Sequence, residues 1–118
     1  MYDTSIRARV RNVPRWRPEM AEKTFERKLK TRIETECSGL CLKLVTPGFT
    51  GIPDRLILLH GGFVVFVETK DTGKSERKRQ TYVHGLLRAF GFKVFNTVNT
   101  MERVNEVVVY CKQLISKV

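Results

Sequence analysis

The sequence Pro53-Asp-Arg-Leu-Ile-Leu-Leu-His-Gly-Gly-Phe-Val-Val-Phe-Val-Glu-Thr-Lys70 contains two apolar runs separated by His60-Gly61-Gly62. Both runs are rich in β-branched, aromatic and leucine residues and lack a helical period, which predicts two β-strands. A short glycine-containing loop between such runs predicts a β-hairpin in a fixed register. The predicted pairs are Leu59 with Phe63, Ile57 with Val65, and Asp54 with Glu68.

This register places two carboxylates, those of Asp54 and Glu68, opposite each other. Directly opposed residues have Cβ atoms roughly 4.5 to 5.5 Å apart, and like charges at that distance destabilise a sheet. Lys70 lies on the same face as Glu68 and offsets part of the charge. Mg²⁺, which prefers carboxylate oxygens, would offset the rest. On spacing alone, an Asp-Glu-Lys surface cluster at frayed strand ends is an equally good interpretation.

The segment before the hairpin has the period of an amphipathic helix. Two acidic residues, Glu22 and Glu26, fall inside its apolar sector, which is formed by Phe25, Leu29, Ile33 and Cys37. An unpaired carboxylate on a buried face is costly. These glutamates therefore either lie at the edge of the stripe, with their carboxylates in water, or bind a ligand.

Four features together resemble a known superfamily: Glu26 in the first helix, Gly51-Ile-Pro-Asp-Arg55, Val67-Glu-Thr-Lys70, and Gln80 downstream. The pattern is similar to the PD-(D/E)XK nuclease superfamily. More narrowly, Thr46 to Arg55, the Gly-Gly hairpin and Gly91-Phe-Lys-Val94 resemble the VRR-NUC (virus-type replication-repair nuclease) family, over about residues 20 to 106. Thr69 stands where members often have an aliphatic residue.

The resemblance implies an α/β fold of the restriction-endonuclease-like type, with a mixed central sheet flanked by helices. It also implies phosphodiester hydrolysis with Mg²⁺ or Mn²⁺. The catalytic residues that it implies are Glu26, Asp54, Glu68, Lys70 and Gln80. The metal ligands would be Asp54, Glu68, the backbone carbonyl of Thr69, and Glu26, with Glu22 as the alternative helix carboxylate. Lys70 would orient or deprotonate the attacking water.

The resemblance favours a structure-selective DNA endonuclease that acts on branched DNA such as Holliday junctions or flaps. Small stand-alone members of this family are typically phage-encoded. Two alternatives stay open: a basic module that binds nucleic acid without cutting it, and a restriction-type enzyme that cuts plain duplex. The choice between DNA and RNA also stays open.

Composition supports a nucleic-acid partner, because 22 Lys and Arg stand against 12 Asp and Glu, for a formal net charge of +10. Residues 1–18 are predicted to form a basic arm and residues 19–118 the nuclease domain. Either the arm lies along nucleic acid, with Trp16 stacked on a base, or it is a solvated tail. The candidate nucleic-acid-binding residues are Arg7, Arg9, Arg11, Arg15, Arg17, Lys43, Arg77 and Arg88.

The rest of the chain predicts a first strand over residues 40–45, a helix from Ser75 to Gly91, a strand over 92–98 and a last helix. The core face of the 75–91 helix is predicted to be Tyr82, Val83, Leu86, Leu87 and Phe90. A wide apolar stripe on the last helix suggests a homodimer. Three cysteines without a metal-binding spacing predict free thiols, and no apolar run could span a membrane. We therefore expect a soluble cytoplasmic protein.

Overall fold

The computed structural model describes residues 18–118, with side chains from residue 22 onward. Along this part of the chain the elements are α2 (Pro18–Cys37), β1 (Leu40–Lys43), β2 (Arg55–Leu59), β3 (Phe63–Thr69), α3 (Lys78–Ala89), β4 (Lys93–Val98) and α4 (Met101–Ile115). The predicted basic arm lies outside the described residues, except for Pro18, which begins α2. None of the described helices has the length and apolarity needed to cross a membrane.

The hairpin of β2 and β3 has the predicted register. Leu59 pairs with Phe63, and Ile57 pairs with Val65. The turn requires positive φ at Gly61 (88°) and Gly62 (80°), a conformation that glycine adopts without steric cost. The glycine pair therefore fixes which residues of the two strands face each other.

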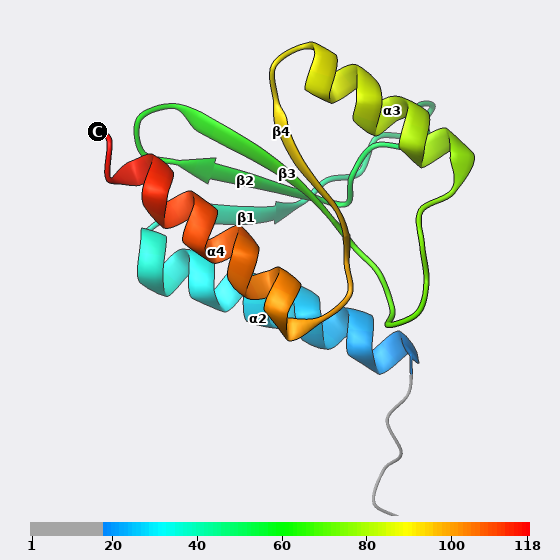
Figure 1. Ribbon diagram of the computed structural model, residues 1–118, viewed down its shortest axis with the longest axis horizontal. Coiled ribbons are helices and arrows are strands. Elements are labelled where there is room, and N and C mark those ends of the chain that lie inside the picture. Colours follow the sequence, from blue (N-terminus) through cyan, green and yellow to red (C-terminus); the bar gives the residue numbers. More distant parts are fainter. Residues whose placement is uncertain (1–17) are drawn as a thin grey trace, which may run out of the picture.

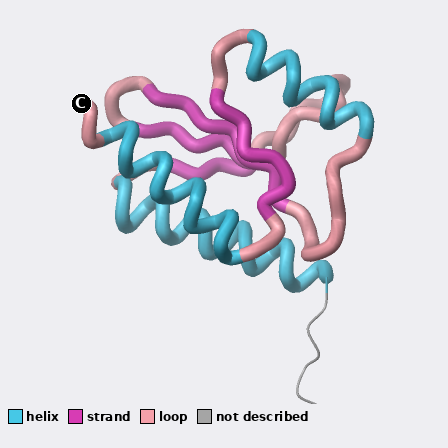
Figure 2. The backbone as a smooth tube through the Cα atoms, viewed as in Figure 1, coloured by secondary structure: helices cyan, strands magenta, loops and turns pink. Residues whose placement is uncertain are grey.

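The four strands form one mixed sheet in the order β1-β2-β3-β4 (Figure 2). The pairs β1–β2 and β2–β3 are antiparallel, whereas β4 pairs with β3 in parallel. A parallel neighbour needs a crossover connection, and α3 forms it. The predicted α/β fold, a mixed sheet flanked by helices, is confirmed.

Helices α2 and α4 lie side by side on one face of the sheet (Figure 1). The α2 stripe is buried as predicted, and the α4 stripe packs against the same core, with Leu114 and Ile115 partly buried at its end. Two other apolar residues of α4, Met101 and Val109, remain 45% and 42% exposed. Three free thiols in this core confirm the cysteine prediction: Cys37, Cys41 and Cys111.

The other face of the sheet is only partly covered, because α3 packs mainly against β4 (Figure 1). Val94 is buried there, while Leu40 and Leu42 on β1 remain 52% and 43% exposed. The alternation of β1 thus buries Cys41 and turns its leucines outward.

Two predictions about α3 are wrong. The helix begins after Arg77 rather than after Ser75. Tyr82 and Phe90, predicted to be core residues, are 59% and 70% exposed, whereas His84 is completely buried. The reason is tertiary: a helix that packs mainly on one edge strand buries a narrower sector than its apolar residues span.

Candidate active site

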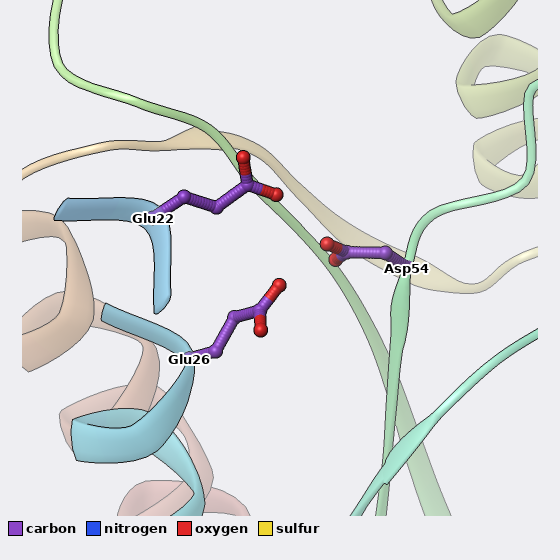
Figure 3. A group of neighbouring side chains, drawn as sticks. All are labelled: Glu22, Glu26 and Asp54. Carbon is purple, nitrogen blue, oxygen red and sulfur yellow. The ribbon is translucent and has the colours of Figure 1, made fainter. Parts of the chain in front are cut away.

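Three carboxylates converge between α2 and the segment that enters β2. Glu22 and Glu26 lie one turn apart on α2 and point toward Asp54 (Figure 3). One oxygen from each lies within 4.8 Å of the other two. The predicted choice between Glu22 and Glu26 is therefore not exclusive, because the helix presents both carboxylates to Asp54.

Thr69, at the end of β3, fixes the orientation of Asp54. Its backbone N–H donates to Asp54 Oδ1 at 3.1 Å, and its hydroxyl donates to Oδ2 at 2.7 Å. The same hydroxyl lies 3.2 Å from Glu26 Oε2, so it can donate to either carboxylate. Thr69 is fully buried. Sequence reasoning gave it only a carbonyl role; a hydroxyl at the dry end of an apolar strand is the signal that was missed.

Glu68 is buried beside this group and has three partners. Its carboxylate accepts from the Asp54 backbone N–H at 3.1 Å and from Gln80 Nε2 at 3.1 Å, and Lys70 Nζ lies 3.3 Å away. Burial, followed by repulsion from Asp54, raises the pKa of Glu68 to about 7. Glu68 thus faces Lys70 and Gln80, and its carboxylate is not one of the three converging groups.

Gln80 is held in a defined orientation by the start of α3. Its Oε1 accepts from the Arg77 backbone N–H at 3.0 Å. With the amide oxygen engaged in this way, the amide nitrogen points to Glu68. The cap of α3 therefore also orients a carboxylate of the site.

The site carries more negative than positive charge. Two cations pair with its carboxylates: Arg55 Nη2 lies 2.8 Å from Glu26 Oε1, and Lys70 is close to Glu68. Among the described residues, these are the two cations whose ion pairs with the four carboxylates are direct. Burial raises the pKa of Asp54, and burial together with Glu26 and Asp54 raises the pKa of Glu22. Converging, incompletely neutralised oxygen ligands are what a hard divalent cation requires, so the residues fit Mg²⁺ or Mn²⁺.

Comparisons with known proteins agree with this geometry. A solved structure described as "VRR_NUC domain" superposes with a TM-score of 0.68, at 31% identity, over 75% of this chain and 94% of that one. The chain belongs to the VRR-NUC family. A protein of Acyrthosiphon pisum secondary endosymbiont phage 1, named "Putative nuclease p44", is 36% identical over 73 residues, 62% of this chain and 77% of that protein. No family model matches the chain.

Family membership makes the protein a nuclease, and basic side chains lie beside its carboxylates. A pocket of about 250 Å³ is lined by Glu22, Lys70, Asp71, Lys74, Ser75 and Arg77. These residues come from α2 and from the segment after β3, and Figure 1 shows this segment passing the first turns of α2. A negatively charged substrate that enters this pocket meets three cationic side chains next to the carboxylates.

The other predicted nucleic-acid contacts are dispersed around this VRR-NUC domain. Lys43, at the end of β1, is exposed. Arg88 is also exposed, although one of its N–H groups donates to the Val94 carbonyl at 3.2 Å. Arg7, Arg9, Arg11, Arg15 and Arg17 lie outside the described residues.

A pair of side chains, buried His84 and partly buried Glu76, joins α3 to the preceding segment. His84 Nδ1 lies 2.7 Å from Glu76 Oε2, and Glu76 Oε1 accepts from Asn96 Nδ2 at 3.1 Å. Burial lowers the pKa of His84, although Glu76 opposes the shift. These contacts tie the segment between Lys70 and α3 to β4. The pair thus supports the wall of the site from outside it.

Proposed function

We propose that this nuclease is a metal-dependent endonuclease that cuts branched DNA such as Holliday junctions or flaps. The observation that supports it most is the convergence of the Glu22, Glu26 and Asp54 carboxylates beside the Glu68–Lys70 pair. A basic pocket adjoins them and suits a phosphodiester backbone. The preference for branched DNA comes from the family resemblance.

The proposed ligands of Mg²⁺ or Mn²⁺ are Asp54, Glu68, the Thr69 carbonyl and Glu26, with Glu22 as a further carboxylate. When bound, the ion supplies a water of lowered pKa and polarises the phosphate. The chain's own contribution is orientation. Thr69 holds Asp54 through two hydrogen bonds, and Arg55 holds Glu26. These contacts fix the carboxylates before substrate arrives.

Lys70 is the proposed general base or water-orienting group, and its ammonium would stabilise charge developing on phosphorus. An ion pair with Glu68, at 3.3 Å, holds the Lys70 ammonium in position. Gln80 keeps Glu68 in place from the opposite side. We assign Glu26, Asp54, Glu68, Lys70 and Gln80 to catalysis on this basis.

DNA would be held by the basic surface, through Lys43, Arg77, Arg88 and the arginines of residues 1–18. The formal net charge of +10 supports phosphate binding. We further propose a homodimer that acts in the cytoplasm of a host cell. The open sheet face, where Leu40 and Leu42 are 52% and 43% exposed, is the proposed dimer contact.

The test is cleavage of labelled four-way junction, flap, single strand and linear duplex with Mg²⁺, Mn²⁺ or EDTA. Lys70→Ala is compared with Lys112→Ala, which removes the same charge from an exposed position on α4. We expect the unmodified chain and Lys112→Ala to cut branched DNA when metal is present. Lys70→Ala should not cut it. Salt-sensitive binding without cutting would favour the binding module, and cutting of plain duplex at fixed sites would favour the restriction-type enzyme.

A further inference from the structure

An exposed group of two aromatic rings and one arginine lies close to the site and has no part in its chemistry. The Arg79 guanidinium carbon lies 4.9 Å from the centre of the Phe49 ring and 5.7 Å from that of the Tyr82 ring. Phe49 is 44% and Tyr82 59% exposed. We call these three side chains the aromatic platform. Exposed rings that cluster around a cation, unlike a single exposed ring, are typical of a binding surface.

The platform is held rigidly by the segment between β1 and β2. Thr46 and Phe49 exchange two hydrogen bonds: the Phe49 N–H donates to the Thr46 carbonyl, and the Thr46 hydroxyl donates to the Phe49 carbonyl. Arg79 Nε donates to the Thr50 carbonyl at 3.1 Å. The Phe49 backbone and the Arg79 side chain are thus held next to each other, which reduces the conformational freedom that is lost when a ligand binds.

Gly51 makes this close approach possible. Its φ is +95°, and a Cβ there would lie 2.8 Å from Val83 Cγ2 and 3.0 Å from the Arg79 carbonyl. Only glycine combines that conformation with that space. The segment therefore packs directly on α3 and presents Phe49 beside Arg79.

The platform adjoins the catalytic group through the chain. Arg79 precedes Gln80, whose amide contacts Glu68, and Gly51 precedes Asp54 by three residues. The neighbours Arg77 and Lys78 are exposed cations. A DNA strand that follows this basic surface to the carboxylates therefore passes flat rings as well as charges.

We propose that the aromatic platform binds an unpaired or unstacked base of the DNA substrate by stacking. Aromatic rings and arginine guanidinium groups stack on any base, and a paired base inside a duplex does not offer its face. The platform would thereby favour DNA that is branched, gapped or single-stranded near the cut. This inference rests on the proposed function, for which it supplies a residue-level source of structure selectivity.

Charge favours a base over an apolar protein surface as the occupant. An apolar partner would bury the Arg79 guanidinium without a matching carboxylate, which is unfavourable. A nucleotide supplies a ring face for stacking and a phosphate for the nearby cations. The same platform therefore satisfies both parts of one ligand.

The experiment measures DNA affinity in a Lys70→Ala background, where binding needs no cleavage. Fluorescence anisotropy compares a duplex with the same duplex carrying a gap of unpaired thymines. The added changes are Phe49→Ala and Tyr82→Ala, alone and together. The matched control is Phe90→Ala, which removes a 70% exposed ring from the far end of α3.

We expect the double change to weaken the binding of gapped DNA by about fivefold to a hundredfold, which is the effect of losing one base stack. The affinity for the duplex should stay the same. Phe90→Ala should change neither affinity. Tyr82→Phe should retain affinity, and 5-iodouracil in the gap should cross-link to Phe49 or Tyr82. Equal weakening on both DNAs would overturn the proposal. So would a change in sedimentation without a change in affinity, which would assign the rings to a contact between copies.

The two proposals can fail separately. If the unmodified chain cuts no DNA but the gap-specific loss is observed, the platform stands and the endonuclease assignment fails. If junctions are cut and the platform variants cut junction and duplex in an unchanged ratio, the endonuclease stands and the platform fails.

Discussion

Replacement of Glu68 by glutamine should stabilise the metal-free protein at alkaline pH while removing its activity. The pKa of this buried carboxyl rises from 4.5 to about 7. The folded state therefore holds the proton more tightly than the unfolded chain, and the stability present below pH 4.5 is lost as the pH rises through 7. At about 1.4 kcal/mol per pKa unit, the loss amounts to roughly 3 kcal/mol at pH 8.

Glutamine removes this ionisation, but it keeps only one acceptor oxygen, so its amide nitrogen faces either the Asp54 N–H or the donors of Lys70 and Gln80. These losses subtract about 1–2 kcal/mol at every pH. We expect Glu68→Gln to unfold at lower urea than the unmodified chain at pH 5 and at equal or higher urea at pH 8, with EDTA present. Glu106→Gln, which removes an exposed carboxylate, is the control. Stability curves for Glu68→Gln and the unmodified chain that run parallel from pH 5 to pH 8 would refute the reasoning.

Three further outcomes follow from the same geometry. Gly51→Ala should lower the free energy of unfolding by about 2 kcal/mol or more in urea titrations, because the new Cβ meets Val83 and the Arg79 backbone at positive φ; a loss under about 0.5 kcal/mol would contradict the close approach. Thr69→Val should lower the free energy of unfolding by about 1–3 kcal/mol at pH 8. The loss should be smaller at acidic pH, where the protonated Asp54 is a weaker acceptor for the Thr69 hydroxyl. An equal loss at both pH values would contradict this role of the hydroxyl. Mg²⁺ should raise the melting temperature at pH 8, EDTA should reverse the rise, and Glu22→Gln should reduce it; an unchanged melting temperature would remove the metal site.

Much of the fold could be predicted from short-range patterns. The period of two in the hairpin, together with its glycine pair, fixes the strand register, and the four-residue spacing of Phe25, Leu29 and Ile33 predicts the buried face of α2. These signals work because each depends on local geometry alone.

The missed features depend on tertiary contacts. Whether Tyr82 and Phe90 are core residues depends on how much of the sheet α3 covers, which no helical period reports. The hydroxyl of Thr69 acquires its role only when β3 brings it to Asp54 and Glu26. In the same way, both helix glutamates reach the site because the first turns of α2 lie beside the entrance to β2.

The most direct test of the central claim is the single-turnover rate of junction cleavage as a function of Mg²⁺ concentration, for the unmodified chain and Asp54→Asn. This substitution keeps the shape of the side chain and removes the charge that it contributes to the converging carboxylates. We predict saturable cleavage by the unmodified chain and a rate lower by at least about a hundredfold in Asp54→Asn, since a metal ligand is lost. An unchanged rate and Mg²⁺ dependence in Asp54→Asn would contradict the assignment of these carboxylates as the metal site of the nuclease.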